Sequence, residues 1–253
     1  MKYNAEFIST TSDDASKSIQ NYFSAREPEL RERYHIVESR LPLLEFPEKI
    51  FGFSPETLII FLSRHSSKAK VNSITVHPVG NFSSNDVGGV QRDIAISCPE
   101  IQSSVLRKMN ETYHGDRYQI TFEATHHGPQ SNNPIIFAEI GTEEENWKDP
   151  VALETLFVGV TEAVPQNFGN FVGVGGGHYA PKISSYAIKN EINIGHIISK
   201  FRMDEIGKEE IEMSIRKTPE CKGFVVDKKG VKSKGMGEVK EIADRLGLEV
   251  III

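Results

Sequence analysis

The chain has 253 residues, enough to bury a substantial core, and 38% hydrophobic and 25% charged residues indicate a soluble globular protein. This balance excludes collagen, a coiled coil and wholesale disorder. The chain has 29 Lys and Arg against 35 Asp and Glu, a formal net charge of −6. It therefore cannot coat nucleic acid by bulk charge, and any RNA contact needs basic residues gathered on one face.

Apolar, strand-like runs alternate with helix-like segments in the first half of the chain. Side-chain oxygens of Ser12, Asp13 and Asp14 can cap a helix that runs to about Arg26. Proline opens and Gly115 ends a second predicted helix, 99–114. The Gly-, Asn- and Ser-rich stretch between the fourth strand and that helix is predicted to be a loop. The predicted strands are 7–10, 34–38, 57–62 and 73–77.

The second half repeats this rhythm, and Asp149-Pro150 starts a helix that runs to about Val164. The lysine-rich segment 227–237 is the best candidate for a flexible joint. Too little chain follows it to form a separate core, so residues 1–253 are predicted to be one domain. The other predicted elements are strands 118–125, 134–140, 168–174, 192–197, 224–226 and 250–253, and helices 181–189, 204–217 and 238–246.

This alternation favours an α/β fold of three layers around a mixed, largely parallel central sheet. No apolar run approaches the roughly 18 residues of a membrane-spanning helix, and the N-terminus lacks the apolar region of a signal peptide. A cytoplasmic protein without membrane contact is therefore expected. The two cysteines, Cys98 and Cys221, form no zinc or disulfide pattern, which leaves eight histidines as metal ligands or proton carriers.

Polar residues follow directly on the apolar strand predicted at 57–62. Ser63-Arg64-His65-Ser66-Ser67 comes first, and His77 ends the next predicted strand. Ligands of α/β sheets bind at the carboxyl ends of strands, so His65 and His77 are expected at adjacent strand ends, where Arg64 could contact a phosphate or carboxylate. The alternative is a solvated loop with two ordinary histidines.

Two adjacent histidines occur in Phe122-Glu123-Ala124-Thr125-His126-His127-Gly128-Pro129. Strand alternation would separate His126 from His127, unless the Gly-Pro turn breaks it and brings both rings into one cavity. Paired neutral rings can bind zinc, with a carboxylate orienting one ring, or act as general base and oxyanion donor. The alternative is a chance pairing. Glu139 lies in a run too apolar for an unpaired acid, which makes it a candidate ligand or histidine-orienting group.

A glycine cluster forms the third stretch, Gly173-Val174-Gly175-Gly176-Gly177-His178-Tyr179-Ala180-Pro181-Lys182. No acid follows at the dinucleotide-binding spacing, and no Gly-Lys-Ser/Thr closes a P-loop, so a nucleotide cofactor is disfavoured. Close backbone approach to a ligand, with amides forming an anion or oxyanion site, is favoured. His178 and Lys182 would project from the start of the next helix, and His196 ends a strand nearby in sequence.

Other hydrolase signatures do not occur in the sequence. It contains neither Gly-x-Ser-x-Gly nor His-Glu-x-x-His, and neither cysteine has the context of a nucleophile. Two kinds of function therefore remain: hydrolysis by an activated water molecule, or binding without a chemical reaction.

These stretches closely resemble the archaeal and plant type of D-aminoacyl-tRNA deacylase. The combination of Glu-Ala-Thr-His-His-Gly-Pro (123–129) with Gly-Gly-Gly-His-Tyr-Ala-Pro (175–181) is highly specific. Gly141-Thr142 departs mildly from an expected Gly-Ser, and the segment after Met203 carries no recognised motif. The resemblance spans positions 63–196, and its residues are Ser63 to Ser67, Thr75 to His77, Gly80-Asn81, Glu123 to Pro129, Phe137 to Gly141, Trp147, Gly173 to Pro181 and Gly195-His196.

The resemblance implies hydrolysis of the ester between a D-amino acid and the terminal ribose of tRNA, which is chirality proofreading in translation. It also implies a phosphorylase/hydrolase-like fold, similar in shape to peptidyl-tRNA hydrolase, and zinc dependence in at least some members. D-aminoacyl-tRNA is thus the expected partner. No protein partner is implied, and a monomer is expected.

Within this hypothesis, His126 and His127 form the centre, where one ring, or a zinc ion held together with His65 or His77, activates water. Glu123 or Glu139 fixes a ring tautomer. The candidate catalytic residues are Glu123, His126, His127, His178 and His196, and the candidate metal ligands are His65, His77, His127 and Glu139.

Substrate contacts are expected chiefly from the glycine stretch. Its amides would receive the oxyanion, and its side-chain-free backbone would be the wall that reads chirality by shape. Tyr179 would stack on the terminal adenine and Lys182 would contact a phosphate. The candidate substrate-binding residues are Arg64, Gly175, Gly176, Gly177, Tyr179 and Lys182.

Two other classes of function fit the same residues. A metal-dependent hydrolase of a small substrate, similar to a peptidase or nucleosidase, would turn over small esters or amides without tRNA. A non-catalytic RNA-binding module would bind tRNA regardless of D-aminoacylation and would not respond to chelators. Fold alone does not choose among them.

Overall fold

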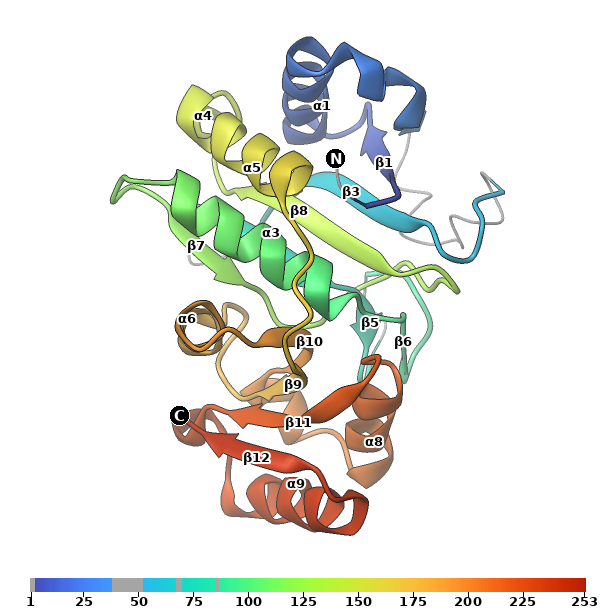
Figure 1. Ribbon diagram of the computed structural model, residues 1–253, viewed down its shortest axis with the longest axis vertical. Helices are drawn as coiled ribbons and strands as arrows, with labels where there is room; N and C mark the ends of the chain where they lie inside the picture. Colours follow the sequence, from blue (N-terminus) through green and yellow to red (C-terminus); the bar gives the residue numbers. More distant parts are fainter. Residues whose placement is uncertain (1–2, 38–51, 67–69, 85–86) are drawn as a thin grey trace.

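A computed structural model describes residues 3–37, 52–66, 70–84 and 87–253, and a six-stranded sheet forms one end of the elongated molecule (Figure 1). Its neighbouring strands are parallel, except that β4 runs antiparallel to β8. The predicted mixed, largely parallel central sheet is thereby confirmed. In spatial order its strands are β2 (Tyr34–Val37), β1 (Ala5–Thr10), β3 (Leu58–His65), β8 (Ile135–Gly141), β4 (Ser73–Pro78) and β7 (Gln119–Phe122).

A second, wholly parallel sheet of four strands forms the other end of the molecule. The sequence patterns did not anticipate that the strands divide between two sheets, because alternation identifies strands but not their partners. Its strands, in spatial order, are β10 (Asn193–Ile198), β9 (Asn170–Val174), β11 (Cys221–Val226) and β12 (Glu249–Ile252), and a short hairpin-like pair is formed by β5 (Gly80–Asn81) and β6 (Asp93–Ile94).

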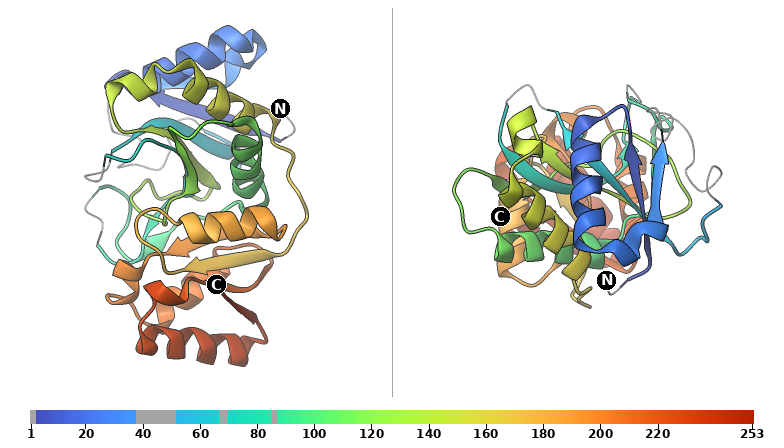
Figure 2. Two further views of the ribbon diagram at one scale, coloured as in Figure 1. Left: turned by 90° about the vertical axis from the view of Figure 1, so that its left-hand side faces the viewer. Right: turned by 90° about the horizontal axis from the view of Figure 1, so that it is seen from above.

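Helices cover one face of the six-stranded sheet (Figure 2). The alternation of β3 shows how its two faces differ. Ile60 and Leu62 join the core beneath the helices, whereas Ile59 and Phe61 belong to a separate apolar cluster on the opposite face. The covering helices are α1 (Asp14–Arg26), α3 (Pro99–Thr112), α4 (Glu144–Trp147) and α5 (Pro150–Glu162).

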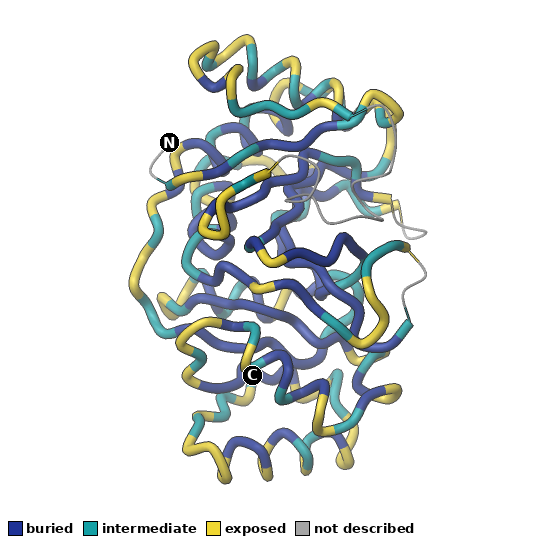
Figure 3. Tube along the Cα trace, turned by 90° about the vertical axis from the view of Figure 1, so that its right-hand side faces the viewer, coloured by how far each residue is buried: buried dark blue, intermediate teal, exposed yellow. Residues whose placement is uncertain are grey.

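The four-stranded sheet has apolar packing on both faces. Phe171 of β9 packs into the large core that also holds α3, while Val172 and Val174 pack on the other side, with α8 and α9. Buried segments therefore run through the middle of the molecule, and exposed positions gather in outer helices and turns (Figure 3). The remaining helices are α6 (Pro181–Lys189), α7 (Lys200–Met203), α8 (Lys208–Arg216), α9 (Ser233–Leu246) and the 3-10 turns η1 (Pro28–Arg33) and η3 (Lys228–Gly230).

Helix ends follow the capping chemistry of the sequence. The Asp13 carboxylate accepts the amides of Ala15 and Ser16, and the Asp149 carboxylate accepts that of Val151. Gly247, at φ +65°, ends α9 in the left-handed conformation that glycine tolerates. None of the helices in the described part of the chain has both the length and the apolar character needed to cross a bilayer.

Several boundaries differ from their predictions. β3 continues to His65 because its last residues pair in register with β8, so Ser63 and Arg64 lie in the strand and not in a loop after it. The predicted joint 227–237 is no loose linker, since η3 and the start of α9 occupy it. Of the predicted strand 34–38, position 38 lies outside the described residues. The single domain stays a prediction.

Candidate active site

The strand register places His65, His77 and Glu139 on the sheet face opposite the helices. β8 lies between β3 and β4, and Phe137 pairs with Phe61 on one side and His77 on the other. Residues two apart on a strand share a face, so Glu139 and His65 project from that same side. Glu139 lies between the two rings, with Oε2 3.4 Å from Nδ1 of His65 and 3.8 Å from Nε2 of His77.

The segment after β7 completes the cluster. β7 ends at Phe122, and His127 adopts a φ of +43°, so strand alternation no longer holds. The His126 and His127 rings consequently pack edge to face, with centroids 4.3 Å apart, and His126 lies equally close to His77. Both rings therefore share one cavity, the outcome expected if the Gly-Pro turn broke the alternation.

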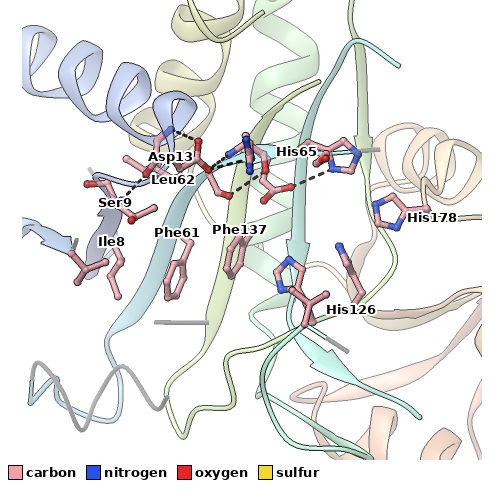
Figure 4. A pocket seen from close by; sticks show the side chains of 18 residues that line it. Ile8, Ser9, Asp13, Phe61, Leu62, His65, His126, Phe137 and His178 are labelled. Carbon is pink, nitrogen blue, oxygen red and sulfur yellow. Dashed lines mark hydrogen bonds and ion pairs between the residues drawn. The ribbon is translucent and has the colours of Figure 1, made fainter. Parts of the chain in front are cut away.

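A cavity of about 370 Å³ opens beside these side chains (Figure 4). His65, His126, His127, His178 and Glu139 line it, while His77 and Glu123 are fully buried. We call this group the histidine cluster: His65, His77, His126, His127, His178, Glu123 and Glu139.

Three rings of the cluster, those of His77, His126 and His127, are held in the same way: Nδ1 is engaged by the backbone, which leaves Nε2 as the ring nitrogen that can bind another ligand. Nδ1 of His77 donates to the Pro78 carbonyl at 3.0 Å, that of His126 to Ala124 at 2.8 Å, and that of His127 to Gly128 at 2.6 Å. Since a carbonyl only accepts, each Nδ1 carries the proton and each Nε2 of the neutral ring keeps a lone pair. One ring nitrogen from each of the three histidines lies within 4.8 Å of the other two, and Nε2 is the nitrogen of each ring that keeps a lone pair for a metal.

Burial keeps these three rings neutral. It lowers the pKa of His77 to about 3 and that of His127 to about 4, and it holds the pKa of His126 well below its usual value, with help from the neighbouring rings. Nε2 of His77 has no hydrogen-bond partner within the described residues. Three neutral imidazoles, each oriented by a second hydrogen bond, are a donor set that suits Zn²⁺.

A second part of the cluster is charged. Nδ1 of His65 lies 2.9 Å from Oε1 of Glu123, and Nε2 of His178 lies 2.8 Å from Oε2. Burial alone would lower the pKa of His65, but contacts with Glu123 and Glu139 raise it to about 10. Burial would raise the pKa of Glu123, yet the two histidines hold it well below its usual value. His65 is thus a buried cation and Glu123 its counter-ion.

Glu139 differs from Glu123 in its pKa. Both carboxylates contact His65, but only Glu123 also contacts His178. Burial raises the pKa of Glu139 to about 7, even though its contact with His65 opposes the shift. A carboxyl group with this pKa can take up and release a proton near neutral pH.

The predicted metal ligands do not form a single group. His77 and His127 gather with His126, which the sequence pattern assigns only to catalysis. His77 also gathers with Glu139 and Glu123, and His65 gathers with Glu123 and His178. His196 lies outside the cluster: its Nδ1 is 3.1 Å from Thr125 Oγ1, and its Nε2 donates to the Ala95 carbonyl at 2.9 Å. With both ring nitrogens engaged and no exposed surface, His196 is packed in the interior and lines neither the cavity beside the cluster nor the one at Gly176 and Gly177.

The glycine stretch also lies elsewhere than expected. The amides of Gly175 and Gly177 donate to the carbonyls of Ile198 and Tyr179, so they are not available to an oxyanion. Gly176 and Gly177 line a second cavity, of about 460 Å³, together with Lys182, Lys200 and Lys229. These glycines do not line the first cavity, so the backbone wall predicted for the reaction centre does not lie beside the histidine cluster.

The remaining predicted contacts divide between the two cavities. Arg64 lines the first, where its guanidinium lies 4.0 Å from the Asp13 carboxylate. Lys182 lines the second and pairs with Asp227 at 3.1 Å. Tyr179 also lines the second cavity, and its ring centroid lies 5.2 Å from that of His65, so it packs behind the histidine cluster.

The sequence patterns place Ile8 and Phe61 in strands, and Phe137 in a strand and in the family resemblance, without a site role for any of them, yet all three line the first cavity. Strand alternation could have identified them. Phe61 precedes His65 by four residues and Phe137 precedes Glu139 by two, so each phenylalanine lies on the same face of its strand as the polar residue of the site.

Gly141 is required by the His65 ring opposite it. A Cβ at Gly141 would lie 2.7 Å from Cβ and 2.9 Å from Cδ2 of His65. Gly141→Ala is therefore expected to lower the free energy of unfolding by about 1–3 kcal/mol, measured by urea denaturation. The control is Gly237→Ala, in α9, where a Cβ meets nothing within 4 Å and alanine should add about 0.5–1 kcal/mol. Equal stability of the two variants would contradict the packing argument.

Comparison with known proteins agrees with this geometry. The family model described as D-aminoacyl-tRNA deacylase matches residues 53–251. A D-aminoacyl-tRNA deacylase of Thermoplasma acidophilum is 50% identical over 196 residues, which cover 77% of each chain. That of Ignicoccus hospitalis is 34% identical over 223 residues, covering 85% of this chain and 91% of the relative.

A solved structure extends the likeness to the whole fold. A crystal structure of a conserved protein of unknown function superimposes with a TM-score of 0.84 at 25% identity, covering 100% of this chain and 96% of the other. The family match spans the strands and loops that build the histidine cluster, from β3 to the segment after β9. The chain therefore belongs to the D-aminoacyl-tRNA deacylase family.

Proposed function

We propose that this protein hydrolyses the ester bond of D-aminoacyl-tRNA in the cytoplasm, releasing the free D-amino acid and tRNA. The observation that carries the proposal is the convergence of five histidines and two buried glutamates beside one cavity, in a chain of this family. An aminoacyl ester is intrinsically labile, so modest catalysis is sufficient. A general base raises the rate by about 10²–10⁴-fold, and an oxyanion donor raises it by about 10²–10³-fold.

We propose His77, His126 and His127 as the residues that would hold zinc. Their three Nε2 lone pairs and the unpartnered, buried Nε2 of His77 fit such an ion. When bound, zinc would polarise the ester carbonyl and acidify water.

Glu139 is the proposed general base. Its carboxylate faces both His77 and the cavity, and its pKa of about 7 suits proton transfer near neutral pH. It takes one proton from the attacking water and returns it to the ribose oxygen as the carbon–oxygen bond breaks.

His65 is the proposed oxyanion donor, in place of the glycine amides. Its pKa of about 10 keeps both ring nitrogens protonated, and Nδ1 faces Glu123 and Glu139. Nε2 is buried without a hydrogen-bond partner among the residues that the structure describes. Because His65 lines the first cavity, this N–H is proposed to stabilise the negative charge that develops on the ester carbonyl oxygen.

Comparing D-tyrosyl-tRNA with L-tyrosyl-tRNA tests the function most directly. The D ester is expected to be hydrolysed at least about 100-fold faster than the L ester. A chelator should abolish this activity, and added Zn²⁺ should restore it. Equal rates for both esters, or turnover of small esters alone, would favour the small-substrate hydrolase. Binding of tRNA without hydrolysis would favour an RNA-binding module.

The lysines of the second cavity are the proposed contacts for tRNA phosphates. Exchanging Lys182 and Lys200 for alanine is expected to weaken tRNA binding and to reduce the slope of log affinity against log salt by about one unit for each phosphate that is no longer neutralised. The control is a double variant of the exposed Lys17 and Lys240, which removes the same charge elsewhere. Filter binding at several salt concentrations measures the affinity and its salt dependence for both double variants. The same slope in the Lys182/Lys200 variant and in the control would exclude a phosphate site at the second cavity.

A further inference from the structure

The first cavity extends far beyond the histidine cluster along a row of apolar side chains. Ile8 on β1 pairs with Phe61 on β3, Phe61 with Phe137 on β8, and Phe137 with His77 on β4. Figure 4 shows Phe61 and Phe137 lying between Ile8 and the histidines. We call Ile8, Phe61 and Phe137 the apolar arm of the cavity.

The strand spacing gives the arm its length. Neighbouring strands lie about 4.8 Å apart, so Phe137, Phe61 and Ile8 lie about 5, 10 and 14 Å from His77 along the row. The arm therefore begins at the proposed ester-cleaving centre and extends away from it across three strands, far enough for an extended aromatic side chain.

The rings of the arm offer their edges to a ligand. Phe61 and Phe137 stack with centroids 4.5 Å apart at an angle of 3°, and Phe137 stacks on His77 at 5.4 Å and 18°. Each ring thus turns its face toward a neighbour in the row, and both faces of Phe137 are occupied. Bases that stack on proteins need an exposed aromatic face. Ring edges carry partial positive charge and attract the face of another aromatic ring.

We propose that the apolar arm binds the side chain of the D-amino acid while its ester carbonyl lies at the histidine cluster. The inference rests on the proposed function and adds a subsite that favours large apolar and aromatic residues. The base of the terminal adenosine fits the arm itself less well, because Ile8, Phe61 and Phe137 offer its ring nitrogens no hydrogen-bonding groups. The polar lining of the same cavity, which includes Ser63 and Arg64, lies beside the arm and suits the ribose and phosphate better.

Substrate-dependent kinetics test this subsite. D-phenylalanine and D-alanine are loaded on the same tRNA, and kcat/KM is measured for both esters. Phe61→Leu, which removes one ring edge, is expected to lower the ratio of D-phenylalanyl to D-alanyl kcat/KM by about two- to tenfold. Ile8→Phe, which shortens the arm, should lower the same ratio at least about tenfold.

Ile135→Val is the matched control. Ile135 is a buried residue of β8 on the same face, two residues before Phe137, and it does not line the cavity. Its replacement should leave the ratio unchanged. If Phe61→Leu and Ile8→Phe reduce both esters equally, the arm does not hold the side chain, and the terminal adenosine becomes its occupant.

A binding measurement separates this inference from the proposed function. The probe is 3′-(D-phenylalanylamino)-3′-deoxyadenosine, an amide that replaces the labile ester, with 3′-amino-3′-deoxyadenosine as the comparison. Nuclear Overhauser contacts between the probe's phenyl protons and Phe61 are expected even if the wild-type protein fails to hydrolyse the ester. Hydrolysis of the D ester combined with phenyl contacts elsewhere would overturn the subsite and leave the deacylase function standing.

Discussion

Replacing both His126 and His127 by alanine is expected to lower kcat/KM for D-tyrosyl-tRNA by at least about 10³-fold. The variant loses two of the three imidazoles in the candidate zinc site, and only His77 remains. Protein-bound zinc, measured after dialysis, should fall with the activity, because a single remaining imidazole cannot hold the ion. The affinity for tRNA should stay nearly unchanged, since neither ring lines the lysine-rich second cavity.

His114→Ala serves as the control for this double variant. His114 is an exposed histidine that does not line the first cavity, and its loss should change neither zinc content nor rate. Thermal unfolding of both proteins shows whether the double variant is folded. Deacylation at the wild-type rate by a folded His126→Ala/His127→Ala protein would refute the assigned centre.

Glu123→Gln is expected to reduce kcat/KM by about 10²–10³-fold while zinc stays bound. Glu123 contacts His65 at 2.9 Å and His178 at 2.8 Å, and it is the buried counter-ion of the His65 cation. Glutamine keeps the shape but removes the charge, so the His65 imidazolium loses stabilisation and its proposed role as oxyanion donor weakens. The rings of His77, His126 and His127 stay oriented by backbone carbonyls, and glutamine keeps a side-chain amide near Nε2 of His126, which lies 3.7 Å from Oε2 of Glu123.

The matched control is Glu210→Gln. Glu210 is also a buried glutamate, but its carboxylate caps the start of α8 by accepting the Gly207 amide. Its replacement should lower stability and leave kcat/KM unchanged. Wild-type activity in Glu123→Gln, or loss of zinc together with activity, would show that Glu123 does not act through His65.

Local sequence signals located much of this site. The two histidine- and glycine-containing motifs identified the family, and the structure brings the adjacent pair 126–127 together with His77 beside the first cavity. The buried acid within the apolar run 135–140 was recognised as needing a partner, and Glu139 contacts both His65 and His77. The family and the need of Glu139 for partners could be predicted because a rare motif or a burial cost is visible without knowledge of the fold.

Predictions that depended on spatial neighbours fared less well. Proximity in sequence suggested that His196 and the glycine stretch belong to the reaction centre. Instead His196 is locked between Thr125 and Ala95, and the Gly175 and Gly177 amides are used within the backbone. Which polar groups are satisfied locally and which remain available is decided by packing, so sequence spacing could not separate them.

The sequence by itself determined the strands, the helix caps and the residue types of the site, because periods of 2 and 3.6 residues and capping oxygens act over a few positions. Only the tertiary structure decided that the strands divide into two sheets, that β4 runs antiparallel beside β8, and that Phe61, Phe137 and His77 form one row. Strand partners and register follow from long-range burial of whole faces, and residues far apart in the chain compete for them.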